Sequence, residues 1–290
     1  MGRFSPRSIL RVLRACGGFG FGVVAYVYLS TPDVRALAYT NPKTTAFMEL
    51  RASEARGLGQ AVRPSQQWVP YTRISQHLKR AVIVTEDSAF FEHEGIDLEQ
   101  IKESIHVSME RGKPFRGAST ITQQLAKNLY LSPSRNPVRK LRELILTRRL
   151  EVALPKARIF EIYLNVIEWG DQVWGAEAAA RRYFGVSAAG LSREQAALMA
   201  GAIRNPHIYN PARPRAGLIR LQQLILSRMG GVEPPAPVPF PVPTPGTEDE
   251  LATPLDVPTS VPSPPEGDEP VAPIPPSSEA PPPPEPEVPR

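Results

Sequence analysis

Cysteine is almost absent from this 290-residue chain, and several other features are scarce as well. The single Cys16 cannot form a disulfide within the chain, so the sequence is not that of a disulfide-stabilised scaffold. Only 20 residues are glycine, far fewer than a collagen-like chain requires. One long apolar run is present, which excludes a membrane protein with many spans. Sustained alternation of apolar and polar residues is missing too, so we expect a mostly helical fold in which any strands form short hairpins.

Acids are missing before Asp33, and bases are missing from nearly all of the C-terminal end. Of the 34 prolines, 22 lie in residues 231–290. The same segment holds 11 acids and one base, a net charge of −10, whereas residues 1–230 carry a net charge of +15. Such a composition cannot build a packed core and favours polyproline II stretches. We therefore expect residues 231–290 to be a disordered, acidic, proline-rich tail that serves as a spacer, a docking arm or an inert solvated end.

The N-terminus combines bases with an apolar run. Residues 15–30 carry no charge, and extension back to residue 9 gives about the 17–25 residues that a bilayer-spanning helix needs. Four arginines lie before or within the start of this stretch: Arg3, Arg7, Arg11 and Arg14. The pattern predicts a transmembrane anchor over residues 9–30, with residues 1–8 in the cytoplasm and the rest of the chain exported. A signal peptide cleaved at the Ala-Leu-Ala site of residues 36–38 is the alternative.

Residues 31–67 form a polar juxtamembrane segment, and residues 68–230 are expected to form one helical domain. Five helix starts are indicated by caps, prolines or apolar periodicity. The first expected helix begins after Asp97, and the second covers Thr120–Leu129 with Ser119 as its cap. The third begins at Asn136-Pro137, and the fourth extends from Pro155 to about Ile167. The fifth covers Arg193–Ile203 and begins with a Ser192–Gln195 capping box. A last helix is expected over Ala216–Met229. Two apolar stripes are expected, one of Leu98, Ile101, Ile105 and Met109, the other of Val138, Leu141, Ile145 and Val152.

An acidic segment over Glu86–Asp97 holds five acids and two phenylalanines. Glu86 follows the apolar run 81–84, so its carboxylate is expected at the end of a buried helix, partly removed from water. Desolvation raises the pKa of a carboxyl group and makes it a better general base near neutral pH. The alternative is a helix end with solvated acids. His93 is expected to be a structural hydrogen-bonding group, because no second histidine lies at metal-ligand spacing.

Two further segments suggest a ligand. Residues 119–124 are rich in hydroxyl and amide side chains, which suit a polar, neutral ligand such as a sugar. A basic stretch follows, made of Lys127, Arg135, Arg139, Lys140, Arg142, Arg148 and Arg149, with Glu143 and Glu151 as its acids. A solvated basic face or a nucleic-acid patch would give the same pattern. Export makes nucleic acid an unsuitable partner, and a phosphate-bearing lipid headgroup suits that compartment better.

Five blocks occur in the order EDSAFFEHEGID, GASTITQQLAKN, RKLRELILTRRLE, IFEIYLNVIEWG and GAEAAARRYFG. In this order they resemble the peptidoglycan glycosyltransferases of glycosyltransferase family 51. The resemblance extends from about Trp68 to Tyr209, and STITQQLAKN is its most specific block. Because only about 60 residues follow the domain, the chain resembles the monofunctional members. The implied fold class is mainly α: a lysozyme-like helical glycosyltransferase domain behind one N-terminal transmembrane helix, with the proline-rich tail as an addition.

The resemblance implies the reaction and its residues. The family polymerises lipid II into β-1,4-linked glycan strands by an inverting displacement that releases undecaprenyl diphosphate. Glu86 matches the family's general base, and Glu143 matches a second carboxylate that organises the diphosphate or a divalent cation. The residues implied to contact substrate or diphosphate are Lys127, Arg135, Gln124, Ser119, Thr120 and Arg139. No cofactor is required, and Mg²⁺ or Mn²⁺ at Glu143 stays an open alternative.

The resemblance also implies partners and location. Lipid II, the growing lipid-linked glycan and the membrane are the implied partners, other cell-wall synthesis proteins are candidates, and nucleic acid is not expected. The implied location is the inner (plasma) membrane, single-pass, with the N-terminus cytoplasmic and the catalytic domain on the outer side. Two other functions stay open: a lysozyme-like peptidoglycan hydrolase or lytic transglycosylase, and a non-catalytic membrane-tethered wall scaffold. Cleavage of a polymer needs no cluster such as Lys127, Arg135 and Arg139, so that cluster favours polymerisation.

Overall fold

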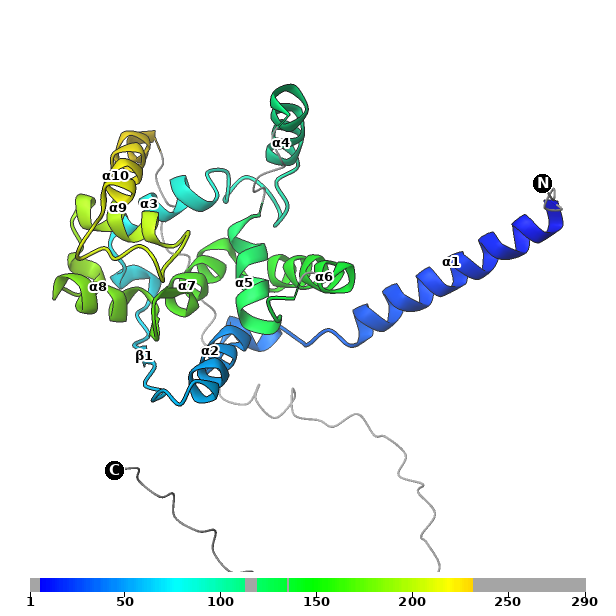
Figure 1. The fold of residues 1–290 in the computed structure, drawn as a ribbon, viewed down its shortest axis with the longest axis horizontal. Coiled ribbons are helices and arrows are strands. Elements are labelled where there is room, and N and C mark those ends of the chain that lie inside the picture. Colours follow the sequence, from blue (N-terminus) through cyan, green and yellow to red (C-terminus); the bar gives the residue numbers. More distant parts are fainter. Residues whose placement is uncertain (1–5, 113–118, 135, 232–290) are drawn as a thin grey trace, which may run out of the picture. The chain divides into compact units, whose positions relative to one another are not determined.

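The computed structural model describes residues 6–112, 119–134 and 136–231 (Figure 1). Within these ranges the chain is mainly helical, as the sequence predicts. The helices are α1 (Pro6–Leu29), α2 (Ala46–Gly57), α3 (Gln76–Glu86), α4 (Leu98–Arg111), α5 (Ile121–Tyr130), α6 (Pro137–Ala153), α7 (Lys156–Val166), α8 (Ala176–Phe184), α9 (Arg193–Ala202) and α10 (Ala216–Arg228). The strands are β1 (Ser65–Gln66), β2 (Glu168–Gly170) and β3 (Val173–Trp174). The predicted tail lies outside the described residues from position 232 onward.

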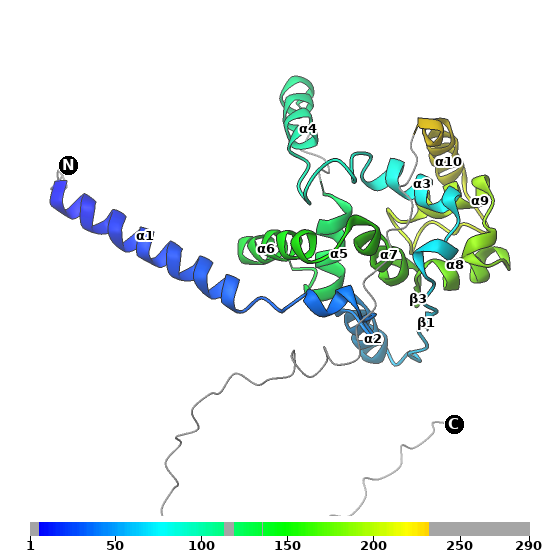
Figure 2. The same ribbon diagram turned by 180° about the vertical axis from the view of Figure 1, so that it is seen from behind.

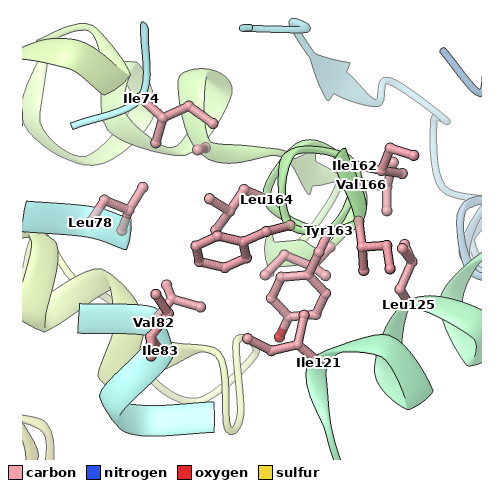
Figure 3. Packing of buried hydrophobic residues seen from close by; sticks show 14 of the residues in the cluster. Ile74, Leu78, Val82, Ile83, Ile121, Leu125, Ile162, Tyr163, Leu164 and Val166 are labelled. Carbon is pink, nitrogen blue, oxygen red and sulfur yellow. The ribbon is translucent and has the colours of Figure 1, made fainter. Parts of the chain in front are cut away.

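Helix α7 lies at the centre of the core and is buried from Ala157 to Val166. Figure 3 shows Leu164 and Tyr163 of α7 packed among side chains of α3 and α5, which include Leu78, Val82 and Ile121. Helices α9 and α10 pack against α3 on one side, and α5 and α6 pack against each other on the other side. Both ribbon views place α7 between α5 and α8 (Figures 1 and 2). The ends of α3 and α5 are thereby held near each other, and those ends carry the candidate site.

The predicted helix starts are mostly confirmed. Three N-caps accept a backbone N–H through their side chains, as expected: Asp97, Asn136 and Ser192. Helix α5 differs, because its N-cap is Thr120 rather than Ser119. The Thr120 hydroxyl accepts the Gln123 N–H at 3.2 Å, and Ser119 is left exposed in front of the helix. Because the N-cap lies one residue later than predicted, the Ser119 hydroxyl does not cap the helix.

The two predicted apolar stripes lie largely on the surface, although Ile101, Leu141 and Ile145 are half-buried. On α4, Met109 is 80% exposed, and Leu98 and Ile105 are exposed as well. On α6, Val152 is 72% exposed, and the buried positions are Glu143, Leu146, Thr147 and Leu150. Helical periodicity identifies a face of uniform character but does not say what covers it. Both helices therefore present apolar side chains on the outside of the described domain.

A small sheet joins the start of the domain to the turn after α7. Its strand order is β1-β3-β2, with β1 parallel and β2 antiparallel to β3. Ser65 pairs with Val173, so the sheet connects positions about a hundred residues apart. The antiparallel β2–β3 pair agrees with the expected short hairpins. Strands of two or three residues contain no measurable alternation, so apolar patterning does not give their positions.

The juxtamembrane segment 31–67 packs against the helical domain. Val34 and Leu37 belong to the hydrophobic core. Arg158 of α7, itself buried, donates hydrogen bonds to the carbonyl oxygens of Leu37 and Thr40, each at 2.9 Å. Arg158 also forms an ion pair with buried Glu161 at 2.7 Å. One buried guanidinium thus binds the segment to the centre of the fold.

Arg158→Met is expected to destabilise the fold by about 3–5 kcal/mol, because it leaves the Glu161 carboxylate buried without a cation. Burial already lowers the pKa of Arg158, so the ion pair carries a desolvation cost that only the complete pair offsets. Chemical unfolding followed by circular dichroism measures the change. Arg220→Met on the exposed face of α10 is the matched control and is expected to change stability by less than about 0.5 kcal/mol. Equal stabilities of the two variants would show that the pair does not hold the segment.

Helix α1 covers the predicted anchor but does not confirm it. Among the described residues, no helix has both the length and the apolarity that a membrane span requires. The C-terminal end of α1 is nevertheless joined to α6. Arg149 donates to the carbonyl oxygens of Tyr28 and Thr31, each at 2.7 Å, and its guanidinium lies 4.6 Å from the centre of the Tyr28 ring. The arginine thus connects α6 to the last turn of α1 and to the residues that follow it.

Candidate functional site

Glu86 ends α3 and lines a pocket of about 370 Å³. Ser119 and Gln124 line the same pocket from the start of α5. Leu221, Leu224 and Ile225 of α10 form an apolar side, and Arg204 and Arg228 add two cations. Neither arginine makes a side-chain hydrogen bond or ion pair within the described residues. The pocket therefore joins one carboxylate, polar neutral groups and unpaired positive charge.

The environment of Glu86 makes its carboxylate harder to ionise than usual. Burial raises the pKa of Glu86 above its ordinary value, although the hydrogen bond from Gln124 and the charges of Arg204 and Lys127 partly oppose the shift. The Gln124 Nε2 donates to Glu86 Oε2 at 2.8 Å. The expectation of a desolvated carboxylate at a helix end is confirmed. Such a group suits proton abstraction near neutral pH.

Tyr163 of α7 sets the orientation of the Gln124 amide. Its hydroxyl donates to Gln124 Oε1 at 2.9 Å, so the Gln124 Nε2 is turned toward Glu86. Tyr163 is completely buried, and burial raises its pKa well above 10, which keeps the donating proton in place. The three residues form one chain of hydrogen bonds from the core to the pocket. Figure 3 shows the hydroxyl of Tyr163 directed toward Ile121 at the start of α5.

Tyr163→Phe is expected to lower the turnover number about tenfold, because the Gln124 amide loses the partner that orients it. The turnover number and the Michaelis constant are measured together, and the loss is expected in the turnover number. Tyr183→Phe is the matched control, since it removes a hydroxyl that donates to the Trp169 carbonyl outside this pocket. Both variants should lose similar stability. A Tyr163→Phe enzyme no slower than Tyr183→Phe would remove Tyr163 from a positioning role.

Asp87 holds the loop after α3 against the start of α5. Its carboxylate accepts the Ile121 N–H at 2.9 Å and lies 2.9 Å from His93 Nε2. The His93 Nδ1 accepts the Gly95 N–H at 3.0 Å, so Nε2 carries the proton and donates to Asp87. Asp87, His93 and Asp97 have their ligand atoms within 4.8 Å of one another, an arrangement that could hold a metal ion. Both histidine nitrogens are already used, however, so the cluster suits a structural latch better.

Gly95 allows the same loop to approach α6. Its φ of +85° and its proximity to Thr147 leave no room for a side chain, because a Cβ would lie 2.6 Å from the Thr147 methyl group. The Gly95 carbonyl accepts a hydrogen bond from the Thr120 hydroxyl at 2.7 Å. Thr120 is buried and does not line the pocket. The structure therefore gives Thr120 a role in joining the loop to α5, rather than a place in the pocket wall.

A second group of charges surrounds Glu143 on α6. The buried Glu143 carboxylate accepts from Arg139 Nη1 at 2.7 Å and from Lys140 Nζ. Both of its oxygens are thus occupied by cations. A divalent ion at Glu143 would have to displace one of them, so the carboxylate suits the positioning of two cations at least as well as metal binding.

Lys127 on α5 interacts electrostatically with Glu86 and with the charged group around Glu143. Burial lowers the pKa of Lys127, and the charges of Arg139 and Lys140 lower it further, whereas Glu143 and Glu86 oppose the shift. Lys127 therefore lies in the field of both carboxylates. Three cations around one buried carboxylate leave excess positive charge, which suits a diphosphate.

Phe47 of α2 contacts the Lys127 side chain. The Lys127 Nζ lies 5.6 Å from the centre of the Phe47 ring, within the range of a cation–π interaction. Helix α2 packs against α5. Phe47 belongs to the segment that the sequence sets apart as juxtamembrane, so nothing in the local pattern indicates this contact.

The predicted site residues divide into three sets. In the first set, Ser119 and Gln124 lie with Glu86 in the pocket. In the second, Arg139 pairs with Glu143, and Lys127 interacts electrostatically with Glu143 and Glu86. The third set lies in neither group, because Thr120 is buried away from the pocket and Arg135 lies outside the described residues. Sequence reasoning missed the residues that reach the site from distant elements. These are Phe47, Tyr163, Arg204 and Arg228.

The chain is similar to a known protein family and to several named proteins. The family model described as Transglycosylase matches residues 54–230. A biosynthetic peptidoglycan transglycosylase of Dechloromonas aromatica is 50% identical over 197 residues, which cover 68% of this chain and 85% of that protein. Proteins of the same name from Nitrosospira multiformis and Herminiimonas arsenicoxydans are 46% identical over 197 residues and 49% identical over 195 residues. These two alignments cover 68% and 67% of this chain, and 86% and 84% of the respective relatives.

Proposed function

Because this chain belongs to the transglycosylase family, with biosynthetic peptidoglycan transglycosylases among its relatives, we propose that Glu86 and the group around Glu143 divide the chemistry between them. The chain is a glycosyltransferase that acts on lipid II and polymerises the glycan strands of peptidoglycan in cell-wall biosynthesis. The roles of individual residues, the membrane topology and the need for a metal ion are the proposed part. The single observation that carries them is the desolvated carboxylate of Glu86, in a pocket close to the excess positive charge around Lys127.

In this proposal Glu86 is the general base. One carboxylate oxygen accepts from Gln124, and the other makes no hydrogen bond within the described residues, so it is available to the acceptor. Glu86 takes the proton of the acceptor 4-hydroxyl as that oxygen attacks the anomeric carbon of the donor. The bond from that carbon to the diphosphate oxygen breaks, and the bonding electrons leave with undecaprenyl diphosphate. One displacement inverts the configuration at the anomeric carbon.

Lys127, Arg139 and Lys140 stabilise the leaving diphosphate. Negative charge grows on its bridging oxygen as the bond breaks, and fixed cations in a partly buried site stabilise such charge more than water does. Glu143 orients Arg139 and Lys140 through both of its oxygens. Arg135, outside the described residues, is proposed as a further cation for the same group. Diphosphate is a good leaving group, so neither a general acid nor a divalent cation is required.

The enzyme is proposed to work on the outer surface of the inner membrane with α1 as its anchor and the N-terminus in the cytoplasm. Exposed apolar side chains support this placement. They include Phe19, Phe21, Tyr26 and Leu29 on α1, Leu98 and Met109 on α4, and Val138 and Val152 on α6. A lipid-linked substrate also confines the reaction to a membrane surface. The bases of α6 would face anionic headgroups there.

Labelled lipid II and purified sacculi test the proposal side by side. The purified full-length enzyme is expected to build labelled polymer from lipid II and to release no muropeptides from sacculi. Release from sacculi without polymer would identify a lysozyme-like hydrolase or lytic transglycosylase and contradict the proposal. Binding to sacculi with neither reaction would identify a wall scaffold and contradict it equally.

A further inference from the structure

A second pocket, of about 650 Å³, lies where the C-terminal end of α1 meets α6. It shares no lining residue with the pocket at Glu86. Its wall contains both charged and apolar groups. The apolar side includes two members of the α6 stripe, the half-buried Ile145 and the exposed Val152.

Positive charge predominates in this α1–α6 pocket. Arg35, Arg148 and Arg149 line it together with one acid, Asp33. Arg35 pairs with Asp33 at 2.7 Å, and this pairing holds the pKa of Asp33 at about 2, so the acid stays ionised and neutralises one arginine. Within the described part of the chain, Arg149 donates hydrogen bonds to carbonyl oxygens alone, so no carboxylate pairs with its charge there.

Arg148 is available to a ligand as well. Its partner is Glu94, and both side chains are largely exposed, at 61% and 79%. An exposed ion pair contributes little to stability, so a phosphate group can replace the carboxylate at small cost. The pocket therefore offers excess positive charge to an anion from outside.

The apolar wall indicates an amphiphile rather than a free anion. Val152 is 72% exposed and Tyr28 is 55% exposed, so both present apolar surface at the pocket. Inorganic phosphate gains nothing from such surface, whereas an acyl chain removes it from water. Anionic headgroup and acyl chain together match the two halves of the wall.

We propose that the α1–α6 pocket binds one anionic phospholipid, whose phosphate contacts Arg148 and Arg149 and whose acyl chain lies along Val152 and Ile145. The inference goes beyond the glycosyl transfer reaction, because the lipid is neither donor nor acceptor. Helix α6 also carries Arg139 and Glu143, and its Arg142 lies 3.5 Å from the Ser30 hydroxyl at the end of α1. A lipid in this pocket would add contacts between the end of α1 and α6, the helix whose Arg139 we propose to bind the diphosphate.

Native mass spectrometry of the full-length protein in detergent, titrated with phosphatidylglycerol, tests the proposal. One tightly bound lipid per chain is expected. Arg148→Gln should weaken its affinity about tenfold, whereas the control Arg182→Gln, which removes the same charge from an exposed position on α8, should not. Val152→Asn should weaken phosphatidylglycerol binding as well. Thermal midpoints of all variants verify that each is folded.

Three outcomes would overturn the inference. The first is an equal loss in Arg148→Gln and Arg182→Gln, which would mean unspecific attraction between a basic protein and an anionic lipid. The second is displacement of the lipid by inorganic phosphate at the lipid's own concentration, which would mean a bare anion site. The third is unchanged binding in the Val152→Asn variant, which would remove the acyl chain from the pocket. None of these measurements uses lipid II, so their outcome does not depend on the catalytic roles proposed for Glu86 and Lys127.

Discussion

Replacing Glu86 by glutamine is expected to lower the rate of lipid II polymerisation by at least about 10²–10³, the scale on which a positioned general base contributes. Glutamine keeps the size of the side chain, and its amide oxygen can still accept from Gln124, so the pocket should keep its shape. An amide cannot take the proton of the acceptor hydroxyl, however. Polymer formed from labelled lipid II measures the rate, and the thermal midpoint reports on the fold.

Two variants make the Glu86 experiment specific. Glu92→Gln removes an exposed acid from the same segment and is expected to leave the rate unchanged. Glu86→Asp keeps a carboxylate but withdraws it by one carbon, so its rate should lie between those of the wild type and Glu86→Gln. A folded Glu86→Gln enzyme with the wild-type rate would mean that another group takes the proton.

Lys127→Met is the second substitution with a large expected effect, a loss of about 10²–10³ in turnover number, because the leaving diphosphate loses a fixed cation. Stability should respond differently from activity. Burial lowers the pKa of Lys127, so the folded state holds a partly desolvated cation whose removal costs little. The thermal midpoint should stay the same or rise. Loss of activity without loss of stability would indicate that the Lys127 side chain contributes to the reaction rather than to folding.

Lys43→Met is the control for Lys127, since it removes an exposed lysine that lies outside both groups of site residues. Phe47→Leu keeps an apolar contact but removes the aromatic ring near the Lys127 ammonium, and a loss of only a few-fold is expected from it. If Lys127→Met lost no more activity than Lys43→Met, the diphosphate would be stabilised by other residues.

The features that the sequence predicts well are those set by neighbouring residues. The caps at Asp97, Asn136 and Ser192 each bind a backbone N–H three positions further along the chain. The desolvation of Glu86 follows from the apolar turn just before it. Ser119 and Thr120 are both residue types that favour the N-cap position. Thr120 is the one that caps α5, and its hydroxyl also donates a hydrogen bond to the Gly95 carbonyl, 25 residues away.

The features that it does not predict depend on distant contacts. Tyr163 reaches Gln124 across 39 residues, and Phe47 reaches Lys127 from a segment without clear periodicity. The stripes on α4 and α6 are present in the sequence, but which face the core covers depends on the packing of α5 and α7. In each case the residue type is visible in the sequence and its partner is not.

The pH dependence of lipid II polymerisation tests the central claim, that Glu86 is a desolvated base, most directly. The ratio kcat/KM should fall with a slope of one proton as the pH is lowered through the raised pKa of Glu86, because the protonated carboxyl cannot act as a base. Gln124→Leu removes a hydrogen bond that lowers this pKa, so its acid limb should lie at higher pH than that of the wild type. An acid limb that stays in place in Gln124→Leu, or moves to lower pH, would contradict the assignment of Glu86.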